Sequence, residues 1–170
     1  NVGGYNSGTG FWTYDSTSGD SIAVHYKIKF TPRNIFGLPD STTTDMTYSL
    51  DVFLKFVEGF NIFNFDYSAA MDMTGIAAYR AHTGNATADG SFDFSIGIHE
   101  TSPQNISLDY AFTSLYKALV ISPTATYRLL SGSVDFTLKF NLTPTVPGVN
   151  YFVAGTLTFN GTRYASLAFG

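Results

Sequence analysis

Apolar and polar residues alternate along most of this 170-residue chain. Between residues 21 and 30, for example, Ile22, Val24 and Tyr26 fall on one side of an extended backbone, and Ala23 and His25 fall on the other. A period of two is typical of a strand that buries one face. The pattern predicts about nine strands, which lie within residues 21–30, 46–57, 60–74, 90–100, 105–112, 124–130, 133–142, 151–160 and 162–169.

Turn-forming residues separate these segments, and helical patterns are scarce. The Asn160-Gly161 pair is the strongest hairpin signal. Only residues 75–82 and 113–120 could form short helices. Many short strands with little helix favour an all-β fold. We therefore predict a single antiparallel domain, with a β-sandwich or jelly-roll-like fold, over residues 21–170.

Residues 1–20 form an N-terminal extension that is rich in glycine and serine. Four aromatic residues stand among the small ones: Tyr5, Phe11, Trp12 and Tyr14. If the segment is drawn as one extended strand, a narrow groove could accept it, because glycines permit close backbone approach. Two hypotheses follow. The segment is a donor strand that connects the subunit to a neighbouring copy through these aromatic residues, or it is the first strand of its own sheet.

Composition excludes several classes of protein. The chain has no cysteine, so a disulfide framework, a thiolate metal site and a cysteine nucleophile are absent. Nine basic residues against thirteen acidic ones, spread thinly, make nucleic acid an unsuitable partner. No apolar run approaches the eighteen or so residues of a membrane span. Because the chain does not begin with methionine, we expect a processed, exported protein at the cell surface or outside the cell.

Four asparagines match the acceptor pattern for N-glycosylation, in which serine or threonine follows two residues later. They are Asn85, Asn105, Asn141 and Asn160. We expect N-glycans as covalent partners, which agrees with export.

No catalytic or metal-binding signature stands out. The three histidines, His25, His82 and His99, are the natural general bases. No G-x-S-x-G nucleophile motif occurs, and there are only two glutamates for glycosidase chemistry. Asp89-Gly90 is typical of a turn and lacks the further ligands of a calcium loop. We predict that the protein is not an enzyme, has no cofactor or metal, and has no histidine that shares a cleft with a carboxylate in catalytic geometry.

Two other functions remain open. Exposed tyrosines can stack on sugar rings, and Tyr79, Tyr116, Tyr127 and Tyr151 could line such a platform in a secreted, lectin-like carbohydrate-binding module. A capsid-type jelly roll is the other alternative.

Several features together resemble a class of secreted filament subunits, the donor-strand pilins, and in particular archaeal threads and bundling pili. They are the lead NVGGYNSGTGFWTY, the lack of cysteine, the glycosylation motifs and the ending TRYASLAFG within a strand pattern. The chain lacks the cysteine pair of chaperone–usher pilins and the long apolar N-terminal helix of type IV pilins. The resemblance implies an adhesive extracellular homopolymer in which each N-terminal strand enters the next subunit.

We predict that the four asparagines lie on exposed turns or strand ends, and that some of them carry glycans, because a bulky sugar must project into water. The intact mass of native protein checks this expectation. A mass equal to the bare 18.5 kDa polypeptide would contradict the modification.

Overall fold

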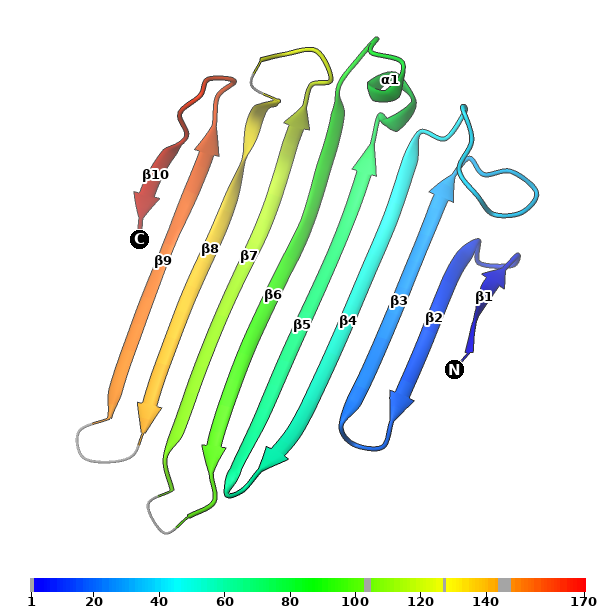
Figure 1. Ribbon diagram of the computed structural model, residues 1–170. Helices are drawn as coiled ribbons and strands as arrows, with labels where there is room; N and C mark the ends of the chain where they lie inside the picture. The colour runs from blue at the N-terminus through cyan, green and yellow to red at the C-terminus, as the bar shows by residue number, and fades with distance from the viewer. Residues whose placement is uncertain (1, 103–104, 127, 144–147) are drawn as a thin grey trace.

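The computed structural model describes residues 2–102, 105–126, 128–143 and 148–170. Ten strands form one antiparallel sheet in which each strand pairs with its neighbours in sequence, from β1 at one edge to β10 at the other (Figure 1). The strands are β1 (Val2–Asn6), β2 (Phe11–Ser18), β3 (Ile22–Thr31), β4 (Asp45–Glu58), β5 (Asn61–Thr74), β6 (Ala86–Glu100), β7 (Ser107–Ile121), β8 (Leu129–Thr143), β9 (Val149–Phe159) and β10 (Ser166–Phe169).

The prediction of an all-β, antiparallel, single-domain fold is confirmed. The strands do not divide between two stacked sheets, since every pairing among the described residues belongs to one sheet. Most connections are short, and a short connection favours pairing between consecutive antiparallel strands. The longer connections are residues 32–44, a loop between β3 and β4, and residues 75–85, which contain a short helix between β5 and β6.

The N-terminal segment is a hairpin rather than one extended strand. The Asn6 carboxamide oxygen accepts hydrogen bonds from the backbone N–H groups of Gly8 and Thr9, at 2.9 and 3.1 Å. The N–H of Gly10 donates to the Asn6 carbonyl oxygen at 2.7 Å. This turn reverses the chain, so β1 pairs with β2, and β2 pairs with β3 of the same sheet.

One of the two predicted helices is present: α1 (Ile76–Arg80) lies within residues 75–82. The prediction for residues 113–120 is wrong, because they belong to β7 and pair with both β6 and β8. The strand predicted at 124–130 is also wrong for most of its length, since β8 begins only at Leu129. None of the described residues forms a helix long and apolar enough to cross a lipid bilayer.

The strand register sorts the side chains onto two faces of different chemistry. One row across the sheet is apolar and comprises Val24, Val52, Tyr67, Phe94, Phe112, Leu138 and Val153. The adjacent row points to the other face and comprises His25, Asp51, Ser68, Asp93, Thr113, Thr137 and Ala154. We call these faces the apolar face and the polar face. The side alternation predicted from the sequence for residues 22–30 is therefore confirmed.

The small core lies at one end of the sheet. Within the described ranges, the buried apolar residues are Ala86, Ala88 and Leu119. The 32–44 loop and α1 lie at the same end (Figure 1), and they are joined by a hydrogen bond from Arg80 Nη1 to the Asp40 carbonyl oxygen at 3.2 Å. Among the described residues, the strands make nearly all of their contacts with their neighbours in the sheet.

A close backbone approach near this core predicts a stability effect. A Cβ added at Gly90 would lie 2.2 Å from the Ala70 carbonyl oxygen on the neighbouring strand. We expect Gly90→Ala to destabilise the fold by about 1–3 kcal/mol, as overpacked sites do. That loss corresponds to a fall in Tm of roughly 2–12 °C for a chain of this size.

Thermal unfolding followed by circular dichroism tests this prediction. Gly4→Ala is the matched control, because a Cβ at Gly4 meets no atom within 4 Å. Equal melting temperatures for the two variants would contradict the assigned contact between β5 and β6.

Candidate functional site

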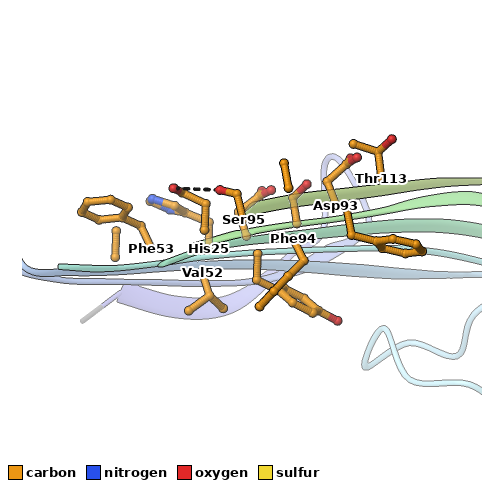
Figure 2. A pocket seen from close by; sticks show the side chains of 14 residues that line it. His25, Val52, Phe53, Asp93, Phe94, Ser95 and Thr113 are labelled. Carbon is orange, nitrogen blue, oxygen red and sulfur yellow. Dashed lines mark hydrogen bonds between the residues drawn. The ribbon is translucent and has the colours of Figure 1, made fainter. Parts of the chain in front are cut away.

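One hollow lies on the polar face and crosses β3 to β7. It has a volume of about 500 Å³. Figure 2 shows His25, Asp93, Ser95 and Thr113 on one side of the sheet and Val52 and Phe94 on the opposite side. The hollow is open because small side chains, among them Ala23, Ser68 and Ala111, stand between larger ones.

The hollow combines one imidazole with three carboxylates, those of Asp51, Asp66 and Asp93. His25 Nδ1 lies 2.7 Å from Asp15 Oδ1, and Ser95 Oγ donates to Asp66 Oδ2 at 3.4 Å. His25 therefore shares the hollow with three carboxylates, and the expectation that no histidine does so in catalytic geometry stays a prediction. The strand register explains the shared hollow, because it places His25 beside Asp15 and Asp51. No group of three metal-ligating side chains occurs in the described part of the chain.

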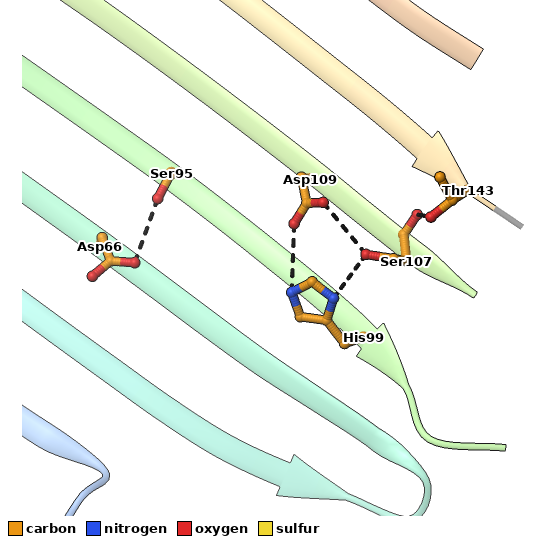
Figure 3. A network of polar contacts seen from close by, with 6 residues as sticks. All are labelled: Asp66, Ser95, His99, Ser107, Asp109 and Thr143. Carbon is orange, nitrogen blue, oxygen red and sulfur yellow. Dashed lines mark hydrogen bonds and ion pairs between the residues drawn. The ribbon is translucent and has the colours of Figure 1, made fainter. Parts of the chain in front are cut away.

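A second polar cluster joins β6 and β7 (Figure 3), near the end of the sheet that lies opposite α1 in Figure 1. Ser107 Oγ lies 2.7 Å from His99 Nδ1. The other imidazole nitrogen, Nε2, lies 3.4 Å from Asp109 Oδ1. The cluster forms because His99 and Ser107 are direct cross-strand partners. A histidine therefore contacts a carboxylate here too, although the sequence analysis did not anticipate it.

The composition of this cluster matches a serine–histidine–aspartate set, but its surroundings do not match acyl-transfer chemistry. Such catalysis needs backbone N–H groups directed at the developing oxyanion. Ser107 lies in a strand that is paired on both sides, with His99 and with Thr143. The ladder engages the N–H groups of such a strand. The imidazole of His99 and the carboxylate of Asp109 are each about half exposed, so water competes for their contacts.

The remaining histidine, His82, lies in the exposed turn after α1 and has no ion pair among the described residues. The polar face also carries an ion pair between Lys117 and Asp135. The Lys117 ammonium group, together with the Thr156 hydroxyl, holds the pKa of the Asp135 carboxyl below its ordinary value. Both groups are exposed, so this pair belongs to the solvated polar face.

The structure places the four candidate connecting aromatics within the chain's own sheet. Tyr5 and Trp12 are cross-strand partners on the apolar face, and their ring centroids lie 5.5 Å apart. Tyr14 lies on the same face. Phe11 lies on the polar face, where the Lys29 ammonium group sits 5.5 Å from its ring centroid.

The 32–44 loop holds Tyr5 and Trp12 in place. Trp12 Nε1 donates to the Gly37 carbonyl oxygen at 3.1 Å, and the Arg33 guanidinium donates to the Tyr5 hydroxyl. The Tyr5 ring lies so close to Gly37 that an added Cβ would be 2.2 Å from a ring carbon. Gly37 also has a φ of 75°, which disfavours any other residue. These contacts fix the hairpin to the sheet. They depend on the strand register, which the sequence alone does not provide.

The four candidate glycosylation asparagines are all exposed. Asn85, Asn105 and Asn160 lie outside the strands, and Asn141 lies near the end of β8 on the polar face. The predicted exposure is thus confirmed, while attachment of glycans stays a prediction.

The candidate sugar-binding tyrosines are dispersed. Tyr79 lies in α1, and its hydroxyl accepts a hydrogen bond from Arg128. Tyr116 and Tyr151 both lie on the apolar face, but the register separates them by six residues, which is roughly 20 Å along a strand. Tyr127 lies outside the described residues. The described three do not form one platform.

No protein-family model, curated protein or solved structure matches this chain. Its function is therefore argued from its own geometry.

The Ser107 cluster gives a direct chemical test. We expect a fluorophosphonate probe to leave Ser107 unlabelled, because no oxyanion site supports attack by its hydroxyl. Ser107→Ala and His99→Ala should change stability by less than about 0.5 kcal/mol, as exposed substitutions usually do. Mass spectrometry of the treated protein checks the labelling. Probe attached to Ser107 in wild type but absent in His99→Ala would overturn the non-catalytic interpretation.

Proposed function

We propose that this protein is a structural subunit of an extracellular filament, and that copies join edge to edge through their sheets. The observation that carries the proposal is the relative position of the two edge strands. A single row of paired residues crosses all ten strands, and it starts at Gly3 in β1 and ends at Phe169 in β10. The two edges therefore lie at the same level of the sheet.

This arrangement suits head-to-tail addition. A copy moved sideways by one sheet width brings its β1 beside β10 of the first copy, with Gly4 opposite Ala168 and Tyr5 opposite Leu167. Because the ten strands alternate in direction, β1 and β10 run antiparallel (Figure 1). The faces match as well, since Tyr5 and Leu167 both belong to the apolar face. Such a contact is heterologous and continues from copy to copy, which produces a filament.

The β10 edge is accessible. Leu167 is 50% exposed and Phe169 is 68% exposed. The N–H of Gly170 donates to the Ala154 carbonyl oxygen of β9 at 3.1 Å. Backbone groups alternate in direction along an antiparallel strand, so the N–H groups of Leu167 and Phe169 point away from β9. An exposed edge of this kind is a template for another strand.

In this proposal the N-terminal strand stays in its own sheet and offers its outer edge to the next copy, in place of the expected insertion into the next subunit. Export and glycosylation fit this function, because the four candidate asparagines lie off the β1 and β10 strands. The polar clusters on the sheet then serve as solvated surface, and no cofactor is required.

A disulfide test probes the proposed register. The chain has no cysteine, so introduced cysteines report a single contact. In the proposed joint, Ala168 faces Gly4 as a non-hydrogen-bonded pair with Cα atoms about 4.5 Å apart, which a disulfide can bridge. We expect the double variant Gly4→Cys/Ala168→Cys to form a ladder of covalent oligomers on mild oxidation, seen on a non-reducing gel.

The matched control moves one cysteine by two residues on the same face, as Gly4→Cys/Ser166→Cys, and should give far less ladder. A second pair of variants distinguishes the backbone hydrogen bond of Leu167 from the packing of its side chain. Leu167→Pro removes the outward N–H, and Leu167→Ala keeps it. Filaments in electron micrographs should be lost in the first and retained in the second. Equal ladders for both cysteine pairs, or normal filaments from Leu167→Pro, would contradict edge pairing.

A further inference from the structure

The apolar face is extensive, and beyond the end that the 32–44 loop and α1 cover it lacks a covering layer in the described part of the chain. The described strands, most of them ten to fifteen residues long, give this face on the order of 1,500 Å² in plan at a strand spacing of about 4.8 Å. All eight aromatic ring pairs of the described residues lie on it, from Tyr5–Trp12 to Phe140–Tyr151. The charged strand positions on this face are Glu58 and Glu100, next to one turn.

The accessible surface of the chain shows that this face is unusual. The chain exposes 10425 Å². A compact monomer of 18.5 kDa exposes about 8,200 Å². The excess is about a quarter, and it arises because one sheet layer cannot bury its apolar side against itself. Monomeric proteins rarely expose apolar patches larger than a few hundred Å².

We infer that the apolar face is a second interface, at which two copies of this chain pack face to face into a two-layered sandwich. The inference concerns a different surface from the edge strands and goes beyond the proposed filament joint. A stable interface buries about 800 Å² on each partner, and obligate ones bury more. The apolar face exceeds that value and therefore fits a partner as broad as the sheet itself. A second copy has that breadth, the same chemistry and, by two-fold symmetry, the same shape.

The distribution of polar features supports this occupant. The candidate glycosylation site within a strand, Asn141, lies on the polar face, and the other three lie outside the strands. Glycans at these positions would leave the apolar face free. The net charge of −4 disfavours the alternative that anionic lipid covers the face. The 32–44 loop and α1 cover only one end of the sheet (Figure 1), so the opposite end remains open to the second copy.

The experiment uses the full chain with the edge-blocking substitution Leu167→Pro, so that face association is measured without filament growth. We expect light scattering coupled to size exclusion to give twice the mass of one chain. The face variant adds Phe56→Asp and Phe65→Asp, and should reduce the mass to that of one chain. In the isolated chain Phe56 is 54% exposed, so the loss reports association more than folding.

The matched control places two aspartates on the polar face of the same strands, as Val57→Asp and Asn64→Asp. Val57 is 64% exposed, and each control residue adjoins its counterpart in sequence. This variant should keep the mass of two chains. A single-chain mass for the background protein, or an equal loss of mass in face variant and control, would overturn the inference.

Thiol accessibility provides a second measurement that does not depend on the aspartate variants folding. In the same background, Val52→Cys places a thiol on the apolar face and Asp51→Cys places one on the polar face. We expect the first to react with a thiol reagent at least ten-fold more slowly than the second. Equal reaction rates of the two thiols would overturn pairing with a second copy. Slow reaction of the Val52→Cys thiol in a protein with the mass of one chain would overturn it as well, and so would flotation of single chains with phosphatidylcholine vesicles.

A failure of this inference is distinguishable from a failure of the proposed filament. If the cysteine ladder forms but the background protein has the mass of one chain, edge pairing stands and face pairing is overturned. If the mass is that of two chains but wild-type protein gives neither ladder nor filaments, the reverse holds.

Discussion

The structure depends on one constraint: a single β-sheet has two faces, and this chain supplies only one layer. Alternating residues divide the sheet into an apolar and a polar face, and the fold buries little on either. Among the residues that the structure describes, the buried apolar ones are Ala86, Ala88 and Leu119, a small number for a chain of this length. Burial of apolar surface normally drives folding, and within one copy much of the apolar surface of the sheet is not fully buried. The association proposed above would bury this apolar surface.

The polar face shows why residue identity alone does not define a catalytic site. His99, Ser107 and Asp109 stand within hydrogen-bonding reach of one another, as catalytic residues do. Yet they occupy consecutive polar positions of a regular ladder, with their backbone groups engaged and their side chains half exposed. Catalysis requires a preorganised and partly dehydrated environment. A flat sheet surface provides the side chains without that environment.

The sequence was sufficient to predict most of the strands and the faces of their side chains, because both follow from alternation within a segment. It was insufficient for the pairing of strands, which depends on loops and register. Residues 113–120 illustrate the difficulty: Leu115 and Leu119 have helical spacing, but pairing with β6 and β8 overrides that local preference. The Ser107 cluster was hidden for the same reason, since it requires knowing that His99 faces Ser107. The N-terminal hairpin depended on a side-chain turn at Asn6 that composition did not reveal.

The level alignment of β1 and β10 has a mechanical consequence. In a filament joined as proposed, the strands lie across the long axis, and each copy contributes about 48 Å of length at a strand spacing of about 4.8 Å. Tension along the axis then pulls strands apart sideways and loads their hydrogen bonds perpendicular to the backbone. The joint is formed by a four-residue strand, β10, against the five residues of β1. Such a thread would part at its shortest pairings, which are the joint itself and the four-residue pairing of β9 with β10.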